Sequence, residues 1–290
     1  MAITELLADS PGLFVFLTIL LGLMVGSFLN VVIHRLPLMM EREWRGQCAE
    51  LLDQPIPESD QAPFNLWRPR SCCPQCGHLI RAVENIPLLS YILQRGRCAH
   101  CQGAISIQYP LVEATSGLLA GMVAWKLGFG WPAAAALIFT WTLLAASVID
   151  FRHQLLPDNL TLPLLWLGLG VALMGLFADL PSAVIGAMAG YLSLWTVYQG
   201  FRLLTGKEGM GFGDFKLLAA LGAWTGWQYL VTIIILSSLV GALFGLALVL
   251  FRKRDRQIPM PFGPFLAAAG WIALLWGGPI NSAYLRWLGG

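Results

Sequence analysis

Two aspartates at the ends of apolar segments are the residues of this chain best suited to chemistry. Asp214 follows two glycines in Gly211-Phe212-Gly213-Asp214, and Asp150 closes another apolar run. A carboxylate at membrane depth costs about 3 kcal/mol, so its presence there favours a functional role. If the two meet, they predict a shared-proton dyad, in which one ionised carboxylate activates water and its protonated neighbour polarises a scissile carbonyl. The glycines would let a substrate backbone pass close to the acid.

Asp214 also has a simpler interpretation. It precedes Phe215-Lys216-Leu217-Leu218, so it could be a helix-capping aspartate that follows two loop glycines. The Gly-x-Gly-Asp pattern alone is therefore weak. Its pairing with Asp150, in a chain that is mostly apolar, favours the catalytic interpretation.

A second candidate site consists of cysteines. Cys73 and Cys76 form one C-x2-C pair, Cys98 and Cys101 form another, and 21 residues separate the pairs. This pattern predicts a closed, structural zinc site with four thiolate ligands, in a zinc-ribbon-like domain. Disulfides are the alternative, but a reducing cytosol disfavours them. Cys72 could compete for the place of Cys73, although only Cys73 gives the matching spacing.

The composition indicates a membrane protein. Of 290 residues, 57% are hydrophobic and 12% are charged, about half of the roughly 25% charge of soluble domains. Eight apolar segments reach spanning or near-spanning length. They are residues 13–33, 111–129, 132–149, 160–177, 182–204, 215–227, 229–251 and 262–278.

The distribution of positive charge predicts the orientation. With eight spans and the N-terminus outside, 16 of the 18 lysines and arginines fall in inner connections, and only Lys126 and Arg286 fall outside. The inner group includes Arg252, Lys253, Arg254 and Arg256, which a re-entrant sixth segment would place outside. The first segment lacks the basic start and cleavage site of a signal peptide. Asp150 then ends the third span and Asp214 opens the sixth, so both acids lie at the inner boundary.

Other polar residues carry weaker predictions. Asp158 follows Pro157, so helix N-capping is its favoured role and support of the site the alternative. Glu113 is expected in a first helical turn, where it would complement the helix dipole. His153 is expected to be a solvated loop residue, and Cys48 a free thiol. Close packing or interhelical hydrogen bonding is expected of Gly26, Ser27 and Asn30.

Taken together, these motifs resemble the bifunctional type IV prepilin peptidase/N-methyltransferase family. The resemblance rests on residues 26–37 (GSFLNVVIHRLP), the paired C-x2-C motifs, Asp150 through Pro157-Asp158, and residues 209–216 (GMGFGDFK). It runs through nearly the whole chain in order. It implies that Asp150 and Asp214 are the catalytic pair and that Cys73, Cys76, Cys98 and Cys101 bind zinc.

The resemblance also implies two activities. The first is cleavage, after a glycine and on the cytoplasmic side, of a short basic leader from prepilins and pseudopilins. The second is methylation of the new N-terminal residue, usually phenylalanine, with S-adenosylmethionine as donor. Residues 84–96 are our candidates for the methyl-donor site.

We therefore expect an all-α polytopic protein of the bacterial inner membrane, with about eight transmembrane helices. Residues 1–33 would form the first helix, 34–110 a cytosolic zinc-binding domain and 111–290 a seven-helix peptidase core, with a periplasmic N-terminus. No nucleotide fingerprint is present, and no nucleic-acid partner is expected. A proton-coupled transporter with a regulatory zinc ribbon is one alternative, and a membrane scaffold is another. The sequence does not indicate an oligomeric state.

Overall fold

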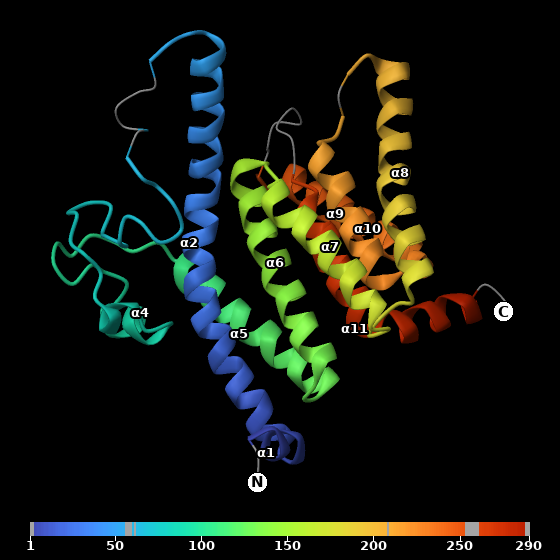
Figure 1. Ribbon diagram of the computed structural model, residues 1–290, viewed down its shortest axis with the longest axis horizontal. Coiled ribbons are helices and arrows are strands. Elements are labelled where there is room, and N and C mark those ends of the chain that lie inside the picture. The colour runs from blue at the N-terminus through green and yellow to red at the C-terminus, as the bar shows by residue number, and fades with distance from the viewer. Residues whose placement is uncertain (1–2, 56–59, 61, 208, 253–260, 288–290) are drawn as a thin grey trace. The chain divides into compact units, whose positions relative to one another are not determined.

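The computed structural model describes residues 3–55, 60, 62–207, 209–252 and 261–287 (Figure 1). These residues form helices and loops; they contain no strands, only two isolated bridges, Cys72 to Leu79 and Arg97 to Ala104. The chain divides into two compact units, Met1–Phe129 and Gly130–Gly290. Three members of the predicted basic cluster, Lys253, Arg254 and Arg256, lie outside the described residues.

Five helical segments of the described chain are long and apolar enough to cross a membrane. They are α2 (Pro11–Leu51), α6 (Trp131–His153), α8 (Leu180–Thr205), Trp227–Ala247, which covers η2 and most of α10 (Leu230–Arg252), and Gly263–Ala283 within α11 (Gly263–Trp287). This confirms the all-helical, polytopic character. The other three predicted spans form α5 (Gln108–Leu127), α7 (Asp158–Leu173) and α9 (Phe212–Thr225).

In the first unit, α5 packs along α2. The short helix α1 (Ile3–Asp9) precedes α2, which does not end near Ile33 but continues to Leu51. A Cβ atom added at Gly26 would lie 2.7 Å from Glu113 Cα, so only glycine permits this approach. Asn30 Nδ2 donates a hydrogen bond to Tyr109 O at 3.1 Å. The predicted packing and hydrogen-bonding roles of these two residues are confirmed.

The loop between α2 and α5 carries two short helices, η1 (Ala82–Asn85) and α4 (Leu89–Leu93). Side chains of α2 hold the start of this loop. The Arg35 guanidinium donates to Asn65 O and Pro69 O at 2.9 and 2.7 Å. Phe64 lies under the Arg42 guanidinium, 4.2 Å from ring centroid to Cζ, in a cation–π contact.

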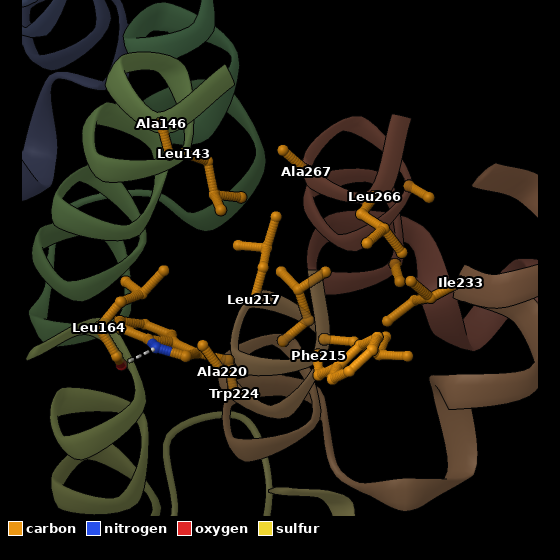
Figure 2. Packing of buried hydrophobic residues seen from close by; sticks show 14 of the residues in the cluster. Leu143, Ala146, Leu164, Phe215, Leu217, Ala220, Trp224, Ile233, Leu266 and Ala267 are labelled. Carbon is orange, nitrogen blue, oxygen red and sulfur yellow. Dashed lines mark hydrogen bonds between the residues drawn. The ribbon is translucent and has the colours of Figure 1, made fainter. Parts of the chain in front are cut away.

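In the second unit, α9 is the central helix and packs against α7, α8 and α11. Every residue from Phe215 to Thr225 is buried except Lys216. A helix that is apolar on all sides is stable only when neighbours cover it. Trp224 Nε1 donates a hydrogen bond to Leu164 O at 2.8 Å, which ties α9 to α7 within the apolar core (Figure 2).

Candidate active site and metal centre

Asp150 lies in the last turn of α6 and is only 6% exposed. Its Oδ2 accepts a hydrogen bond from the backbone N–H of Gly263 at 2.9 Å. Gly263 is the first residue of α11, and a Cβ atom added there would lie 2.6 Å from the same carboxylate oxygen. A glycine is therefore required at this position, because any side chain would collide with Asp150.

Asp214 lies in the first turn of α9 and is 9% exposed. The helix begins at Phe212 after Gly211, and no side chain caps it. The capping interpretation of Asp214 is therefore wrong. Its Oδ1 atom is buried and has no hydrogen-bond partner among the described residues. An unpaired buried carboxylate oxygen is costly, which indicates a role that needs a free acceptor or a proton.

The fold brings the two acids together from α6 and α9. They are close enough for the charge of Asp150 to act on Asp214. Leu156 packs between the glycines beside them. A Cβ atom added at Gly213 would lie 2.6 Å from Leu156 Cβ, and one at Gly263 would lie 3.2 Å from Leu156 Cδ1. Two buried carboxyls in these different environments, one hydrogen-bonded and one not, are suited to acid–base chemistry.

Asp158 has a different role from the one predicted. It is the first residue of α7, the cap position is Pro157, and no side chain caps the helix. Both carboxylate oxygens of Asp158 instead accept from Lys216 Nζ at 2.7 Å. Lys216 is two positions after Asp214, so this ion pair joins the start of α7 to the helix that carries the acid. Support of the site, the alternative for Asp158, fits this geometry.

Sequence reasoning missed two residues at this site, Gly263 and Lys216. Gly263 stands between Phe262 and Pro264 at the start of a span, and glycine there could have indicated a close backbone approach. Lys216 carried a weaker signal, a lysine in a mainly apolar segment. His153 is exposed, as predicted, but it is the last residue of α6 rather than part of a loop.

Glu113 also differs from its prediction. Helix α5 begins at Gln108, so Glu113 lies beyond the first turn. The side chain is buried, and its Oε2 accepts a hydrogen bond from the backbone N–H of Leu88 at 2.8 Å. Ser27 Oγ donates to Asn85 Oδ1 nearby, at 3.4 Å. These contacts anchor the loop around η1 and α4 to α2 and α5.

The four predicted cysteine ligands converge in the first unit. The Sγ atoms of Cys73, Cys76, Cys98 and Cys101 all lie within 4.8 Å of one another, and this group could hold a metal ion. The Sγ atoms of Cys73 and Cys101 are 3.8 Å apart, and none of the six cysteines forms a disulfide. Cys72 and Cys48 stand outside the group, as predicted; Cys48 lies on α2 and is exposed.

The two C-x2-C turns have the same backbone geometry. Cys73 N–H donates to His78 O and Gly77 N–H to Cys73 O; in the other turn, Cys98 N–H donates to Gly103 O and Gln102 N–H to Cys98 O. Both turns contain a left-handed residue, Gly77 at φ +71° and Gln102 at φ +59°.

Backbone amides in these turns point at the first sulfur of each pair. Hydrogen bonds from the backbone of Cys76 and Gln75 lower the pKa of Cys73 to about 7. Those of Cys101 and His100 lower the pKa of Cys98. Burial and the neighbouring thiols raise the pKa of Cys76 instead. The lowered values at Cys73 and Cys98 favour the thiolate form that a metal ligand requires.

The predicted methyl-donor segment, residues 84–96, covers the end of η1 and all of α4. Glu84 Oε2 accepts from the backbone N–H of Arg81 at 2.9 Å and lies 3.3 Å from His78 Nε2. The Arg81 amide, and then the His78 side chain, lower the pKa of Glu84. No contact here identifies a methyl donor, so this assignment stays a prediction.

Two family models match the chain. Residues 20–127 match the bacterial peptidase A24 N-terminal domain, and residues 137–246 match the type IV leader peptidase family. The boundary between the matches falls close to the boundary between the two structural units, Phe129 and Gly130.

Curated proteins match over their full length. The chain is 58% identical to the prepilin leader peptidase/N-methyltransferase of Stutzerimonas stutzeri, over 97% of each chain. It is 58% identical to the protein of that name from Pseudomonas aeruginosa, over 100% of this chain and 99% of the relative. The Aeromonas hydrophila protein of that name is 57% identical, over 97% of each chain. No solved structure matches the chain.

Proposed function

The chain belongs to the prepilin leader peptidase/N-methyltransferase family, and we propose that it cleaves the leader from prepilins and pseudopilins and then methylates the new N-terminus. The observation that carries the peptidase half is the meeting of Asp150 and Asp214, both buried, on separate helices of the second unit. Full-length relatives with both activities in their name favour this function over the transporter and the scaffold.

In the proposed cleavage, the two carboxyls share one proton. The ionised carboxylate takes a proton from water, and the resulting hydroxide attacks the scissile carbonyl carbon. The protonated carboxyl donates a hydrogen bond to the carbonyl oxygen, where negative charge develops. The C–N bond then breaks as the leaving amine takes a proton from the pair. Gly263 holds one oxygen of Asp150 throughout, so that carboxylate needs little reorientation.

We place these acids at the cytoplasmic boundary of the inner membrane. All eight predicted segments would span, with the N-terminus in the periplasm. The shortest of these helices, α9, does not cross the hydrocarbon core by itself. α9 has 14 residues, about 21 Å at 1.5 Å per residue, which is less than the roughly 30 Å hydrocarbon core. Its neighbours α7, α8 and α11 cover α9, which supports a placement in which one end of α9 lies below the membrane surface. Residues 1–33, 34–110 and 111–290 remain our proposed functional domains.

For the four-cysteine group we propose zinc in a structural role. A tetrahedral ion with Zn–S bonds of about 2.3 Å separates its sulfurs by about 3.8 Å. The Cys73–Cys101 distance of 3.8 Å and the mutual limit of 4.8 Å fit that ion. Cys73, Cys76, Cys98 and Cys101 would hold it and close the two turns on each other, leaving no position for a substrate.

S-adenosylmethionine would supply an activated methyl group to the second reaction. The acceptor is the new α-amino group, which with a pKa of about 7.7–8 is partly neutral near pH 7. The protein has to hold that amine in line with the donor, and such positioning can supply much of the rate. Residues 84–96 are our proposed site, supported by their attachment to the membrane helices through Glu113 and Ser27.

The test is incubation of the detergent-solubilised protein with a leader-bearing prepilin and S-adenosylmethionine. We expect a mobility shift on gel electrophoresis and, by mass spectrometry, one added methyl group on the mature N-terminus. Intact prepilin after prolonged incubation with folded protein would contradict the peptidase assignment. Cleaved but unmethylated product would contradict the second activity alone.

A further inference from the structure

The second unit contains an apolar groove between α8 and α10, which has a volume of about 400 Å³. Leu194 and Val197 of α8 line one side, and Gly241 and Ala242 of α10 line the other. Met210 and Phe262, which also line the groove, stand just before the first residues of α9 and α11. Ser238 provides the one polar side chain in the lining. Ligand sites commonly have volumes of this size.

The groove adjoins both acids. Phe262 directly precedes Gly263, whose N–H binds Asp150 Oδ2. Met210 lies four positions before Asp214 and directly precedes Gly211. The wall formed by α8 continues toward the same acid.

One helical turn after Leu194, the Tyr198 ring packs against Phe212 and Phe215 at centroid distances of 5.4 and 5.7 Å. These two phenylalanines flank Asp214 in the sequence, two positions before it and one after it. A segment lying in the groove would therefore end beside the two carboxyls.

Small residues on α10 leave space for this groove. Gly241 and Ala242 are adjacent on α10, and a Cβ atom at Gly241 would already lie 3.3 Å from the Phe265 ring. Val197 on the opposite side is 62% exposed. Within a bilayer, small residues permit the close approach of another helix. Van der Waals packing, rather than the hydrophobic effect, then stabilises the contact.

We propose that this groove binds the apolar segment of the prepilin that lies beside its scissile bond. This inference rests on the proposed peptidase function and adds the element that selects the substrate. The lining is apolar apart from Ser238, so apolar residues next to the cut would fit it best and bring the scissile bond to Asp150 and Asp214. Lipid chains and a second copy of this protein are the competing occupants.

The first test fills the groove. Ala242→Trp and Val197→Trp place a large ring inside it, and Val240→Trp places the same ring on α10 at an exposed position outside the lining. We expect the KM for prepilin to rise by about tenfold in both groove variants, a loss of about 1.4 kcal/mol of binding. Val240→Trp should match the wild type. Thermal unfolding of each purified variant shows whether the fold is retained.

The second test asks what occupies the groove. A photoreactive benzophenone amino acid at Val197 should cross-link to prepilin in the Asp214→Asn background, whereas the same group at Leu192, exposed on α8 and outside the lining, should not. Cross-links to lipid or to a second copy alone, together with a wild-type KM in Ala242→Trp, would overturn the proposal that the groove binds prepilin. Cleavage by Val240→Trp would still support the peptidase assignment in that case. Failure of the wild type and of Val240→Trp to cleave would instead reject the peptidase function.

Discussion

The backbone N–H of Gly263 donates a 2.9 Å hydrogen bond to Asp150 Oδ2 and joins two positions 113 residues apart. This bond fixes the orientation of a buried carboxylate with a group that has no side chain. It also makes the start of α11 part of the proposed catalytic geometry, because any displacement of Gly263 moves the donor away from the acid.

Gly263→Ala should lower the rate of prepilin cleavage by about 100-fold, since a displacement of about 1 Å at a catalytic group can cost that factor. The added Cβ atom would lie 2.6 Å from Asp150 Oδ2. Gly278→Ala on the same helix is the control, because nothing lies within 4 Å of its added Cβ. The measurement is initial cleavage rate, with circular dichroism as a check of folding. Wild-type activity in Gly263→Ala would show that this contact does not position the acid.

Asp150→Asn and Asp214→Asn should each lower cleavage by at least about 10²–10⁴-fold, the usual contribution of an acid–base group. Both proteins should remain folded and inserted in the membrane, because the amide has nearly the same shape as the carboxyl. Gel-shift assays over a long time course would detect the residual activity. Normal cleavage by the Asp214 variant would rule out the aspartyl mechanism.

Lys216→Met should lower kcat more than it raises KM, because the Asp158–Lys216 pair positions α9 two residues after Asp214. Stability should change by only about 0–1 kcal/mol, as for other partly exposed ion pairs; the side chains are 29% and 50% exposed. The exchanged pair, Asp158→Lys with Lys216→Asp, should recover part of kcat. Lys207→Met is the control for charge alone. An exchanged pair no better than the single variant would remove this positioning role.

Freshly purified, reduced protein should contain about one zinc ion per chain, the content of a single four-thiolate site. Cys98→Ser should lose the metal and loosen the loop, because structural zinc contributes folding free energy to small domains. Cys48→Ser, outside the cluster, should retain both metal and stability. Elemental analysis and limited proteolysis measure the two effects. Zinc-free wild-type protein would contradict the site.

Methylation and cleavage should be separable. Asp214→Asn protein should still methylate a pre-cleaved pilin, since methyl transfer requires a positioned amine and not the aspartate pair. Cys98→Ser should lose methylation at least as readily as cleavage. Mass spectrometry of the pilin N-terminus gives the readout. A folded Asp214→Asn protein that cannot methylate pre-cleaved substrate would indicate one shared centre.

The sequence predicts where helices form better than where they end. Apolar runs place all eight segments in helices, but α2 continues from the predicted end at Ile33 to Leu51. Polar residues such as Arg35 and Arg42 end an apolar run but do not end a helix. Their contacts with the loop, at Asn65 and Phe64, could not be predicted from the sequence.

At the candidate sites too, local patterns were predictable and long-range contacts were not. The motifs around Asp150, Asp214 and the four cysteines predicted which residues meet, because the charge and spacing of these residues can be read from short stretches of sequence. The favoured capping role of Asp158 and the helix-dipole role of Glu113 were wrong, since their partners, Lys216 and the Leu88 N–H, lie 58 and 25 positions away. Local preference alone favoured a cap and a helix dipole for these two acids.

The burial of α9 decides which molecule must change shape during cleavage. The helix is enclosed by α7, α8 and α11, and exposing Asp214 would separate apolar surfaces on three sides at once. We therefore expect the acid to stay in place and the substrate to present its scissile bond in a non-helical conformation, because a peptide bond inside a helix has its N–H and C=O already hydrogen-bonded. Residues that weaken helix formation at the cut should then accelerate the reaction, so local flexibility of the substrate would itself be a recognition signal.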